Sequence, residues 1–189
     1  MRIITGSARG ANLFTLAGEA TRPTAQRTKE AIFSMIQFDI EGRKVLDLFA
    51  GSGQLSLEAL SRGAAEAVLC DSSREAVNII RRNAEKTRLA DKCKINVTDA
   101  NAFIGRLGSE KFDIVFLDPP YALKLIPGVL NRLLECRRLK STSIVVCETA
   151  DSCDVFGGNT ELAEKYIIKK QAKYGAAFVT ILQPKEDAI

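Results

Sequence analysis

The stretch Phe112-Asp113-Ile114-Val115-Phe116-Leu117-Asp118-Pro119-Pro120-Tyr121 joins a short apolar run to four residues of different chemistry. The run 112–117 is rich in β-branched and aromatic residues, which is typical of a parallel strand buried on both faces. We therefore predict a buried strand that ends just before Asp118. Ligands of open α/β sheets bind at the carboxyl ends of the strands, so residues 118–121 lie where a site is expected.

The Asp-Pro-Pro-Tyr segment is suited to holding an amino group. Neither proline has a backbone N–H, and Pro120 favours an extended conformation at Pro119, so the polar atoms presented are the Asp118 carboxylate and the Pro119 carbonyl. Two such acceptors favour a pyramidal amine nitrogen that can attack a methyl group, and Tyr121 offers a ring for base stacking. A plain surface turn explains Asp and one Pro, but not the second Pro with the ring. Our candidate catalytic residues are Asp118, Pro119, Pro120 and Tyr121.

A second motif, Asp47-Leu48-Phe49-Ala50-Gly51-Ser52-Gly53, predicts a cofactor site. Residues 44–49 indicate another buried strand, and the two glycines permit a tight turn and close backbone approach where a helix begins. We expect this helix to end near Arg62-Gly63. The alternatives are a plain strand-to-helix turn or a dinucleotide site. The dinucleotide site is disfavoured because Ser56 stands where its fingerprint has Gly or Ala.

Two further carboxylates follow predicted strands over 66–70 and 93–97. Asp71 can accept hydrogen bonds from both ribose hydroxyls of NAD or S-adenosylmethionine, and Asp99 lies at the height of the adenine. Helix capping is the competing role, with a capping-box pattern at Ser72 and Glu75 and a cap at Asp99. Our candidate cofactor residues are Asp47, Phe49, Ala50, Gly51, Gly53, Asp71, Ser72, Asp99 and Ala100.

Length and composition restrict the class of protein. A chain of 189 residues allows one domain with a substantial core, and alternating strand and helix signals predict a parallel α/β sheet. We see no apolar run that could span a membrane and no signal-peptide pattern, and expect a cytoplasmic protein. The chain has no histidine, which excludes histidine general bases and histidine-bound metals. Its five cysteines lack paired spacing, so we expect no metal and interpret Cys70 and Cys147 as small buried hydrophobes.

The remaining elements flank this sheet. Residues 2–16 predict two short strands around a loop, and Thr24 is a plausible cap for a helix that carries Ala31, Ile32, Phe33 and Ile36 on one face. Later in the chain we expect a helix over 125–139, a strand over 143–147 and a terminal strand pair over 166–168 and 177–182. We divide the chain into an N-terminal extension, 1–40, packed on a main domain, 41–189.

The net charge of +4 is unevenly distributed. Cations of the N-terminal extension lie in loops rich in Gly, Thr and Pro, which suits contact with a polyanion. For the cations of segment 74–88 we favour a solvated helix surface; these are Arg74, Arg81, Arg82, Lys86 and Arg88. Our candidate RNA-contact residues are Arg9, Arg22, Thr24, Arg27, Lys169 and Lys173.

Taken together, these motifs resemble the bacterial small-subunit ribosomal RNA methyltransferase D family. The resemblance covers nearly the whole chain and rests on Arg22-Pro23-Thr24, the segments 47–53 and 118–121, and Ser61-Arg62-Gly63-Ala64. It implies a Rossmann-like class I methyltransferase fold with a mostly parallel seven-stranded sheet. It also implies methyl transfer from S-adenosyl-L-methionine to N2 of guanine 966 in 16S rRNA of the small ribosomal subunit. We expect a monomer.

Two other functions fit part of the pattern. An N6-adenine DNA methyltransferase would use the same Asp-Pro-Pro-Tyr segment. This segment indicates that the methylated atom is an amino nitrogen and not a ring carbon, but it does not distinguish adenine from guanine. The chain is short for a separate target-recognition domain, which counts against it. A nonenzymatic RNA-binding assembly protein would keep the fold, although the intact tetrapeptide at 118–121 favours activity. The leading hypothesis is an N2-guanine rRNA methyltransferase.

Overall fold

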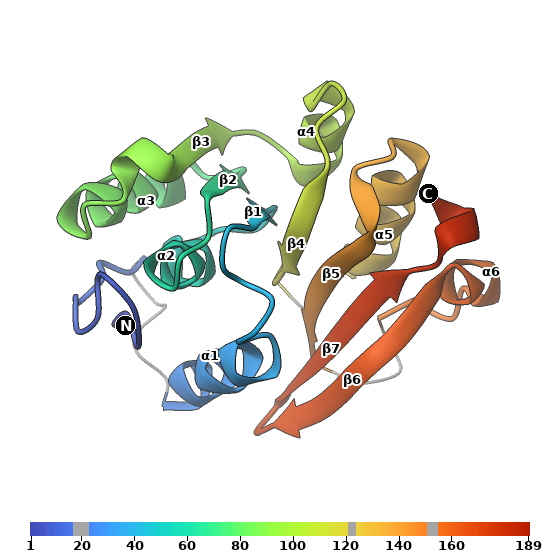
Figure 1. The fold of residues 1–189 in the computed structure, drawn as a ribbon, viewed down its shortest axis with the longest axis horizontal. Coiled ribbons are helices and arrows are strands. Elements are labelled where there is room, and N and C mark those ends of the chain that lie inside the picture. The colour runs from blue at the N-terminus through green and yellow to red at the C-terminus, as the bar shows by residue number, and fades with distance from the viewer. Residues whose placement is uncertain (17–22, 121–123, 151–154) are drawn as a thin grey trace.

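The computed structural model describes residues 1–16, 23–120, 124–150 and 155–189. Within these ranges seven strands form one sheet in the order β3-β2-β1-β4-β5-β7-β6 (Figure 1). The strands are β1 Lys44–Asp47, β2 Glu66–Asp71, β3 Cys93–Val97, β4 Phe112–Leu117, β5 Leu139–Thr149, β6 Tyr166–Tyr174 and β7 Ala177–Pro184. Strands β1 to β5 pair in parallel, and β7 runs antiparallel to β5 and β6. The predicted α/β fold with a mostly parallel sheet is confirmed.

Helices cover both faces of the sheet (Figure 1). One face carries α1 Pro23–Met35, α2 Gln54–Ser61 and α3 Arg74–Lys86, and the other carries α4 Ala100–Arg106, α5 Ile126–Glu135 and α6 Thr160–Glu164. Two short 3₁₀ turns, η1 Ala90–Lys92 and η4 Glu186–Ala188, complete the described elements. Along β4, Ile114 and Phe116 join the first core and Val115 and Leu117 the second. Every residue of β4 is therefore buried, as its apolar run predicts.

The strand order reverses at β1, which lies between β2 and β4. A reversal in an open α/β sheet leaves a crevice beyond the carboxyl ends of the two strands, because their crossover connections leave in opposite directions. The crevice here falls after Asp47 on β1 and Leu117 on β4. Both predicted motifs begin at these strand ends, so the fold brings them together.

The N-terminal segment differs from the predicted pair of strands. Residues 1–16 contain one isolated bridge, between Arg2 and Asn12, and no regular strand. Three backbone hydrogen bonds across the loop accompany this bridge, among them the one from Leu13 N to the carbonyl of Met1 at 2.8 Å. The backbone N–H groups of Ile4 and Thr5 instead donate to the carboxylate of Glu58 on α2, at 2.7 and 3.0 Å. The segment is therefore held by hydrogen bonds to α2 as well as by this short pairing of its own.

Two predicted helix boundaries are also wrong. Helix α1 begins at Pro23, so Thr24 lies inside its first turn and not at the cap position. The expected helix over 125–139 ends at Glu135, because Arg137 adopts a left-handed φ of 54° and reverses the chain before β5. The sequence offers neither Gly nor Pro at this turn, so no stop signal was visible. The terminal strand pair is confirmed as β6 and β7, both longer than predicted.

Two further expectations concern the cysteines and membrane-spanning segments. Cys70 and Cys147 are fully buried in the sheet, as predicted for small hydrophobes. Among the described helices, none is long and apolar enough to cross a membrane.

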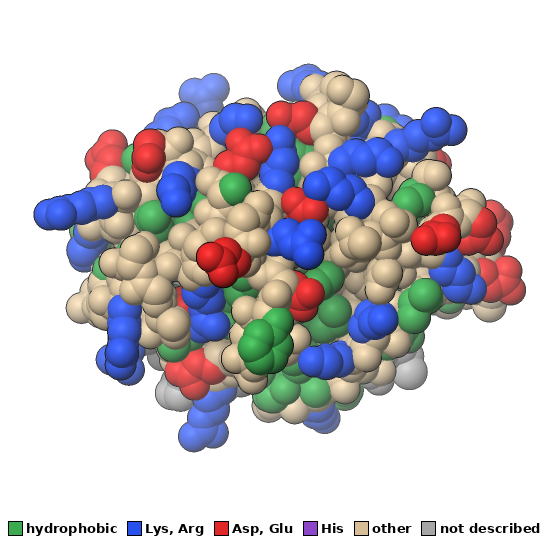
Figure 2. All heavy atoms as spheres, in the orientation of Figure 1, with side chains coloured by type: hydrophobic (Ala, Val, Ile, Leu, Met, Phe, Trp, Pro, Cys, Tyr) green, Lys and Arg blue, Asp and Glu red, His purple; other side chains and the backbone are tan. Residues whose placement is uncertain are grey.

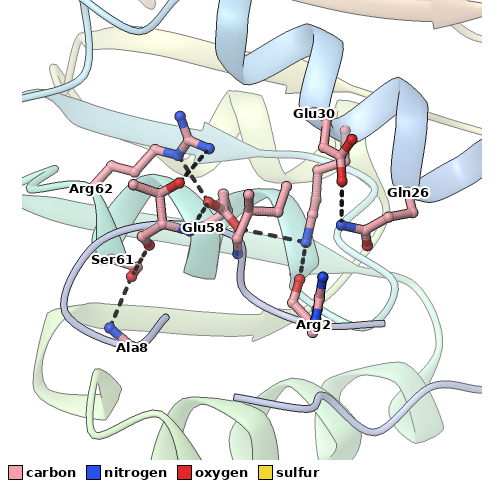
Figure 3. Close-up of polar contacts among 10 residues, drawn as sticks. Arg2, Ala8, Gln26, Glu30, Glu58, Ser61 and Arg62 are labelled. Atoms are coloured by element: carbon pink, nitrogen blue, oxygen red, sulfur yellow. Dashed lines mark hydrogen bonds and ion pairs between the residues drawn. The ribbon is translucent and has the colours of Figure 1, made fainter. Parts of the chain in front are cut away.

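A buried ion pair joins the N-terminal segment to α1 and α2 (Figure 3). Glu58 has no exposed surface, and its carboxylate lies 3.5 Å from the Lys29 ammonium, which is 1% exposed. Lys29 Nζ also donates to the carbonyl of Arg2 at 2.6 Å, and Arg62 Nε donates to Glu58 at 2.8 Å. Burial lowers the pKa of Lys29, and the Glu58 charge opposes that shift. The carboxylate thus collects donors from three parts of the chain.

We expect Glu58→Ala to lower the free energy of unfolding by about 3–5 kcal/mol, because it leaves a buried ammonium without its partner. Lys29→Met is the matched control. It should cost less, because Glu58 keeps its donors from Ile4, Thr5 and Arg62. Urea unfolding followed by circular dichroism measures both. A larger loss in Lys29→Met would show that the ammonium, and not the carboxylate, organises this region.

Candidate active site

A cleft of about 770 Å³ opens at the carboxyl edge of the sheet. Its size is in the range of sites for small ligands and cofactors. The residues that line it come from the ends of β1, β2, β3 and β4 and from neighbouring loops: Leu16, Leu48, Phe49, Gly51, Asp71, Ser72, Ser73, Thr98, Asp99, Ala100, Asp118, Pro119, Pro120 and Leu125. The two sequence motifs therefore share one cleft.

The glycine loop between β1 and α2 needs glycine at two positions. Gly51 and Gly53 have φ values of 52° and 78°, in the left-handed region that other residues rarely adopt. A Cβ on Gly53 would also come within 3.3 Å of Ile80 on α3. The loop is fixed by hydrogen bonds from Ala50 N to the carbonyl of Cys70 at 3.0 Å and from Gly53 N to the carbonyl of Ala50 at 2.7 Å. The backbone of Gly51 can thus approach a ligand closely.

Asp71 connects this loop to the start of α3. Its Oδ2 accepts a hydrogen bond from Gly51 N at 2.9 Å, and its Oδ1 accepts one from Ser73 N at 2.8 Å. Each carboxylate oxygen has a second lone pair, so Asp71 can accept further bonds from a ligand in the cleft. Ser73, and not Ser72, caps α3 by accepting from Ala76 N at 3.2 Å. The predicted capping box at Ser72 is therefore wrong by one position.

Asp99 caps a helix, which is the competing role that the sequence suggested for it. Its carboxylate caps α4 by accepting from Asn101 N at 2.9 Å and Ala102 N at 3.1 Å. It also lines the cleft, one residue after Thr98, whose backbone N–H pairs with the carbonyl of Asp71 at 3.0 Å. Capping therefore does not exclude a contact between Asp99 and a ligand.

Asp118 and the two prolines lie where the buried strand ends. Asp118 is half-buried, Pro119 is buried and Pro120 is exposed, and all three line the cleft. Asp118 has interactions within the protein as well. The fourth residue of the motif, Tyr121, lies outside the described residues.

Asp47 is buried beneath the glycine loop. It is 1% exposed, and its Oδ2 accepts a hydrogen bond from the Ser56 hydroxyl of α2 at 2.9 Å. Its Oδ1 has no hydrogen-bond partner among the described residues. Burial raises the pKa of Asp47 to about 7; the Ser56 bond opposes this shift, and the nearby Asp71 charge adds to it. Ser56, which disfavoured the dinucleotide fingerprint, thus has a partner of its own on β1.

Six of the nine predicted cofactor residues line the cleft: Phe49, Gly51, Asp71, Ser72, Asp99 and Ala100. The other three, Asp47, Ala50 and Gly53, are not among the lining residues and support the loop instead. Sequence reasoning missed Leu16, Leu48, Ser73, Thr98 and Leu125. Ser73 and Thr98 adjoin predicted residues at strand ends, so the same argument could have found them. Leu16 carried no signal, because it reaches the cleft from the N-terminal segment.

The cleft is acidic. Asp71, Asp99 and Asp118 line it, and none of its described lining residues is Lys or Arg. A dinucleotide would bring two phosphates into this negative environment without a cation to bind them. A cationic sulfonium nucleoside with ribose hydroxyl donors fits these acceptors better. The described residues therefore fit S-adenosylmethionine and disfavour NAD.

Four of the candidate RNA-contact residues, Arg9, Arg27, Lys169 and Lys173, are not among the residues that line the cleft. Arg9 is exposed in the N-terminal loop, Arg27 is exposed on α1, and Lys169 and Lys173 are exposed on β6. Helix α1 packs beside β6, where Lys170 Nζ donates to the carbonyl of Met35 at 3.1 Å. Figure 2 shows basic side chains spread over the viewed face and interspersed with acidic ones. Arg22 lies outside the described residues.

The sheet order, the glycine loop and the acidic cleft define the class of protein, a Rossmann-like α/β methyltransferase. The structure superposes on that of a putative methyltransferase, yhhF, from Escherichia coli with a TM-score of 0.83 and 26% identity over 98% of both chains. A conserved hypothetical protein of Streptococcus pyogenes gives a TM-score of 0.74 and 37% identity, over 85% of this chain and 97% of that one.

Sequence comparison gives the family. A family model described as conserved hypothetical protein 95 matches residues 1–183. The putative rRNA methyltransferase YlbH of Bacillus subtilis is 31% identical over 98% of this chain and 100% of its own length. The ribosomal RNA small subunit methyltransferase D of Haemophilus influenzae is 33% identical over 79% of this chain and 78% of its own. The chain belongs to this family, the small-subunit rRNA methyltransferase D family that its motifs resemble.

The raised pKa of Asp47 predicts a pH dependence of stability. The folded protein keeps a proton on Asp47 up to about pH 7, whereas the unfolded chain loses it near a pKa of about 3.9. The contribution of this group to the free energy of unfolding is therefore fully present below about pH 4 and is lost as pH rises to about 7. The expected loss is on the order of 4 kcal/mol.

Asp47→Asn should remove this component, so its stability should fall less than that of the wild type between pH 4 and pH 7. Urea unfolding across that range measures the difference. Asp91→Asn, at an exposed carboxylate in η1, is the control and should follow the wild type. Parallel curves for wild type and Asp47→Asn would show that Asp47 is ionised throughout.

Proposed function

We propose that this protein transfers a methyl group from S-adenosyl-L-methionine to the exocyclic N2 of a guanine in 16S rRNA of the small ribosomal subunit. The observation that carries the proposal is one cleft lined by both Asp118-Pro119 and the acidic cofactor residues. The names of the relatives support an rRNA substrate, since they are an rRNA methyltransferase and a small-subunit rRNA methyltransferase. The target base in the family, guanine 966, is the expected nucleotide.

The cofactor residues have separate tasks in this proposal. Asp71 would accept from the ribose hydroxyls while it holds Gly51 in place, and Asp99 would lie beside the adenine. Phe49, Ser72 and Ala100 would form the wall against which the nucleoside packs. The bound cofactor supplies an electrophilic methyl group that needs no metal and no acid to activate it.

The acceptors at the end of β4 would act on the target amine. The Asp118 carboxylate and the Pro119 carbonyl would each accept one N–H of the guanine amino group, which favours a pyramidal nitrogen with an available lone pair. Pro119 and Pro120 have no backbone N–H that could bind this lone pair in competition. The alkylated nitrogen is acidic and loses its proton readily, so the absence of histidine from the sequence is compatible with the reaction.

The decisive experiment uses small subunits and 16S rRNA from a strain that lacks the modification. The protein is incubated with each of these, and separately with duplex DNA, in the presence of labelled cofactor. We expect label in rRNA, and mass spectrometry of nuclease fragments should map it to one guanine. Labelling of DNA alone would reject the proposal in favour of adenine methylation. Cofactor binding without transfer to any substrate would favour a nonenzymatic assembly role.

Asp71→Ala should weaken cofactor binding by about 1–3 kcal/mol, because it removes an acceptor from the ligand and leaves the Gly51 N–H without its partner. Calorimetric titration measures this loss. A cofactor analogue without the ribose 2′-hydroxyl separates the two causes, since the variant should lose less with the analogue if Asp71 contacts that hydroxyl. Equal losses with both ligands would limit Asp71 to holding the loop.

Asp118→Asn should lower the turnover number by about 100- to 1,000-fold, because one of the two acceptors needed as the amine becomes pyramidal is replaced by a donor or a weaker acceptor. Cofactor affinity should change much less. Steady-state methylation of saturating 16S rRNA and calorimetry give the two values. Comparable losses in both would mean that Asp118 acts by shaping the cleft.

A further inference from the structure

An exposed aromatic ring in the N-terminal segment holds two cations of α3. Phe14 is 39% exposed. The Arg82 guanidinium carbon lies 4.1 Å from the centre of its ring, and the Lys86 ammonium lies 4.5 Å from it. Arg82 and Lys86 are one helical turn apart, so both reach the ring from the same side of the helix. Among the described residues neither cation pairs with a carboxylate.

The position of Phe14 is fixed by a buried amide. Asn83 has no exposed surface, and its Oδ1 accepts from Phe14 N at 2.8 Å. Its Nδ2 donates to the carbonyl of Phe14 at 2.9 Å and to that of Ser52 at 2.8 Å. Both backbone polar groups of Phe14 are therefore bound by one side chain. The same side chain ties this segment to the glycine loop.

Phe14 is close along the chain to a residue of the cleft. Leu16, two residues beyond Phe14, lines the cleft, and two residues of chain span at most about 7 Å. The sequence alone suggested that Arg82 and Lys86 belong to a solvated helix surface. The structure adds the contact of both cations with the Phe14 ring, and the closeness of Phe14 along the chain to Leu16 of the cleft.

We propose that Arg82 and Lys86, ordered by the Phe14 ring, bind phosphates of the RNA strand whose base enters the cleft. The inference rests on the proposed function and adds a contact surface to it. Free lysine and arginine side chains lose rotamer freedom when they bind a phosphate. Contact with a fixed ring restricts them before binding, so less freedom is lost in the complex. Phe14 is a positioning residue, and the two cations are the contacts.

The test measures binding to deproteinised 16S rRNA from a strain lacking the modification, across a range of salt concentrations. Removing both cations with Arg82→Gln and Lys86→Gln should lower the slope of log affinity against log salt by about 1.4–1.8, taking 0.7–0.9 per phosphate contact. At about 0.1 M salt this corresponds to about 25- to 60-fold weaker binding. Cofactor affinity should remain that of the wild type.

Phe14→Leu separates positioning from charge. It keeps both cations and a large apolar side chain, so the salt slope should stay at the wild-type value while binding weakens by about three- to tenfold. A charge-matched control removes Arg81 of α3 and Arg106 of α4, two exposed cations that do not contact the ring, by substitution with Gln. This control should lower the slope less than the Arg82 and Lys86 double variant.

Two outcomes would overturn the inference: a double variant with the affinity and slope of the wild type, or a charge-matched control that loses as much. Methylation of the same RNA by the wild-type protein is measured alongside. If the wild type methylates rRNA and the double variant binds normally, the inference fails while the proposed function stands. If the wild type methylates neither this RNA nor small subunits from the same strain, the proposed function is rejected.

Discussion

The site depends on the parallel pairing of β1 with both β2 and β4. Parallel strands end at the same edge of a sheet, so Asp47, Asp71 and Leu117 close neighbouring strands side by side. The order reverses at β1, which opens a crevice at that edge. Neither the glycine loop nor the Asp-Pro-Pro segment could form a cleft alone. The long-range pairing brings them together.

Buried polar side chains fix the irregular segments around this edge. Glu58 holds the N-terminal segment, Asp71 holds the glycine loop, and Asn83 holds both Phe14 and Ser52. Each satisfies backbone groups that lack a partner in a helix or strand, which is the condition for burying such backbone. Asp47 differs, since one of its oxygens has no hydrogen-bond partner among the described residues, and burial raises its pKa.

Periodicity and composition predicted the regular part of the fold. The strands β3 and β4 begin and end at the predicted residues, because their apolar runs have clear limits. Boundaries set by tertiary contacts were missed. Arg137 turns the chain without glycine, and Ile4 and Thr5 give their backbone donors to Glu58 of α2, which local sequence does not encode.

The candidate site, like the fold, could be predicted from the sequence only in part. Residues at strand ends could be inferred, because the edge of a parallel sheet follows from the strand assignments. Leu16 and the contact of Phe14 with Arg82 could not, because they join segments far apart in sequence. The same limit explains why the cations of α3 looked like an ordinary solvated surface.

Charges of opposite sign lie on the cleft wall and around Phe14. The described cleft wall carries three carboxylates and no cation, whereas Arg82 and Lys86 contact Phe14, two residues before the cleft residue Leu16. Exposed charges act over about 8–10 Å at moderate salt. The acidic wall therefore disfavours phosphates inside the cleft, and Arg82 and Lys86 attract phosphates outside it. Under the proposed function the RNA backbone would therefore stay outside the cleft, and only an uncharged base could reach Asp118. A paired base does not reach so far from its backbone, so this arrangement requires the target nucleotide to be unstacked and turned out of its helix or loop.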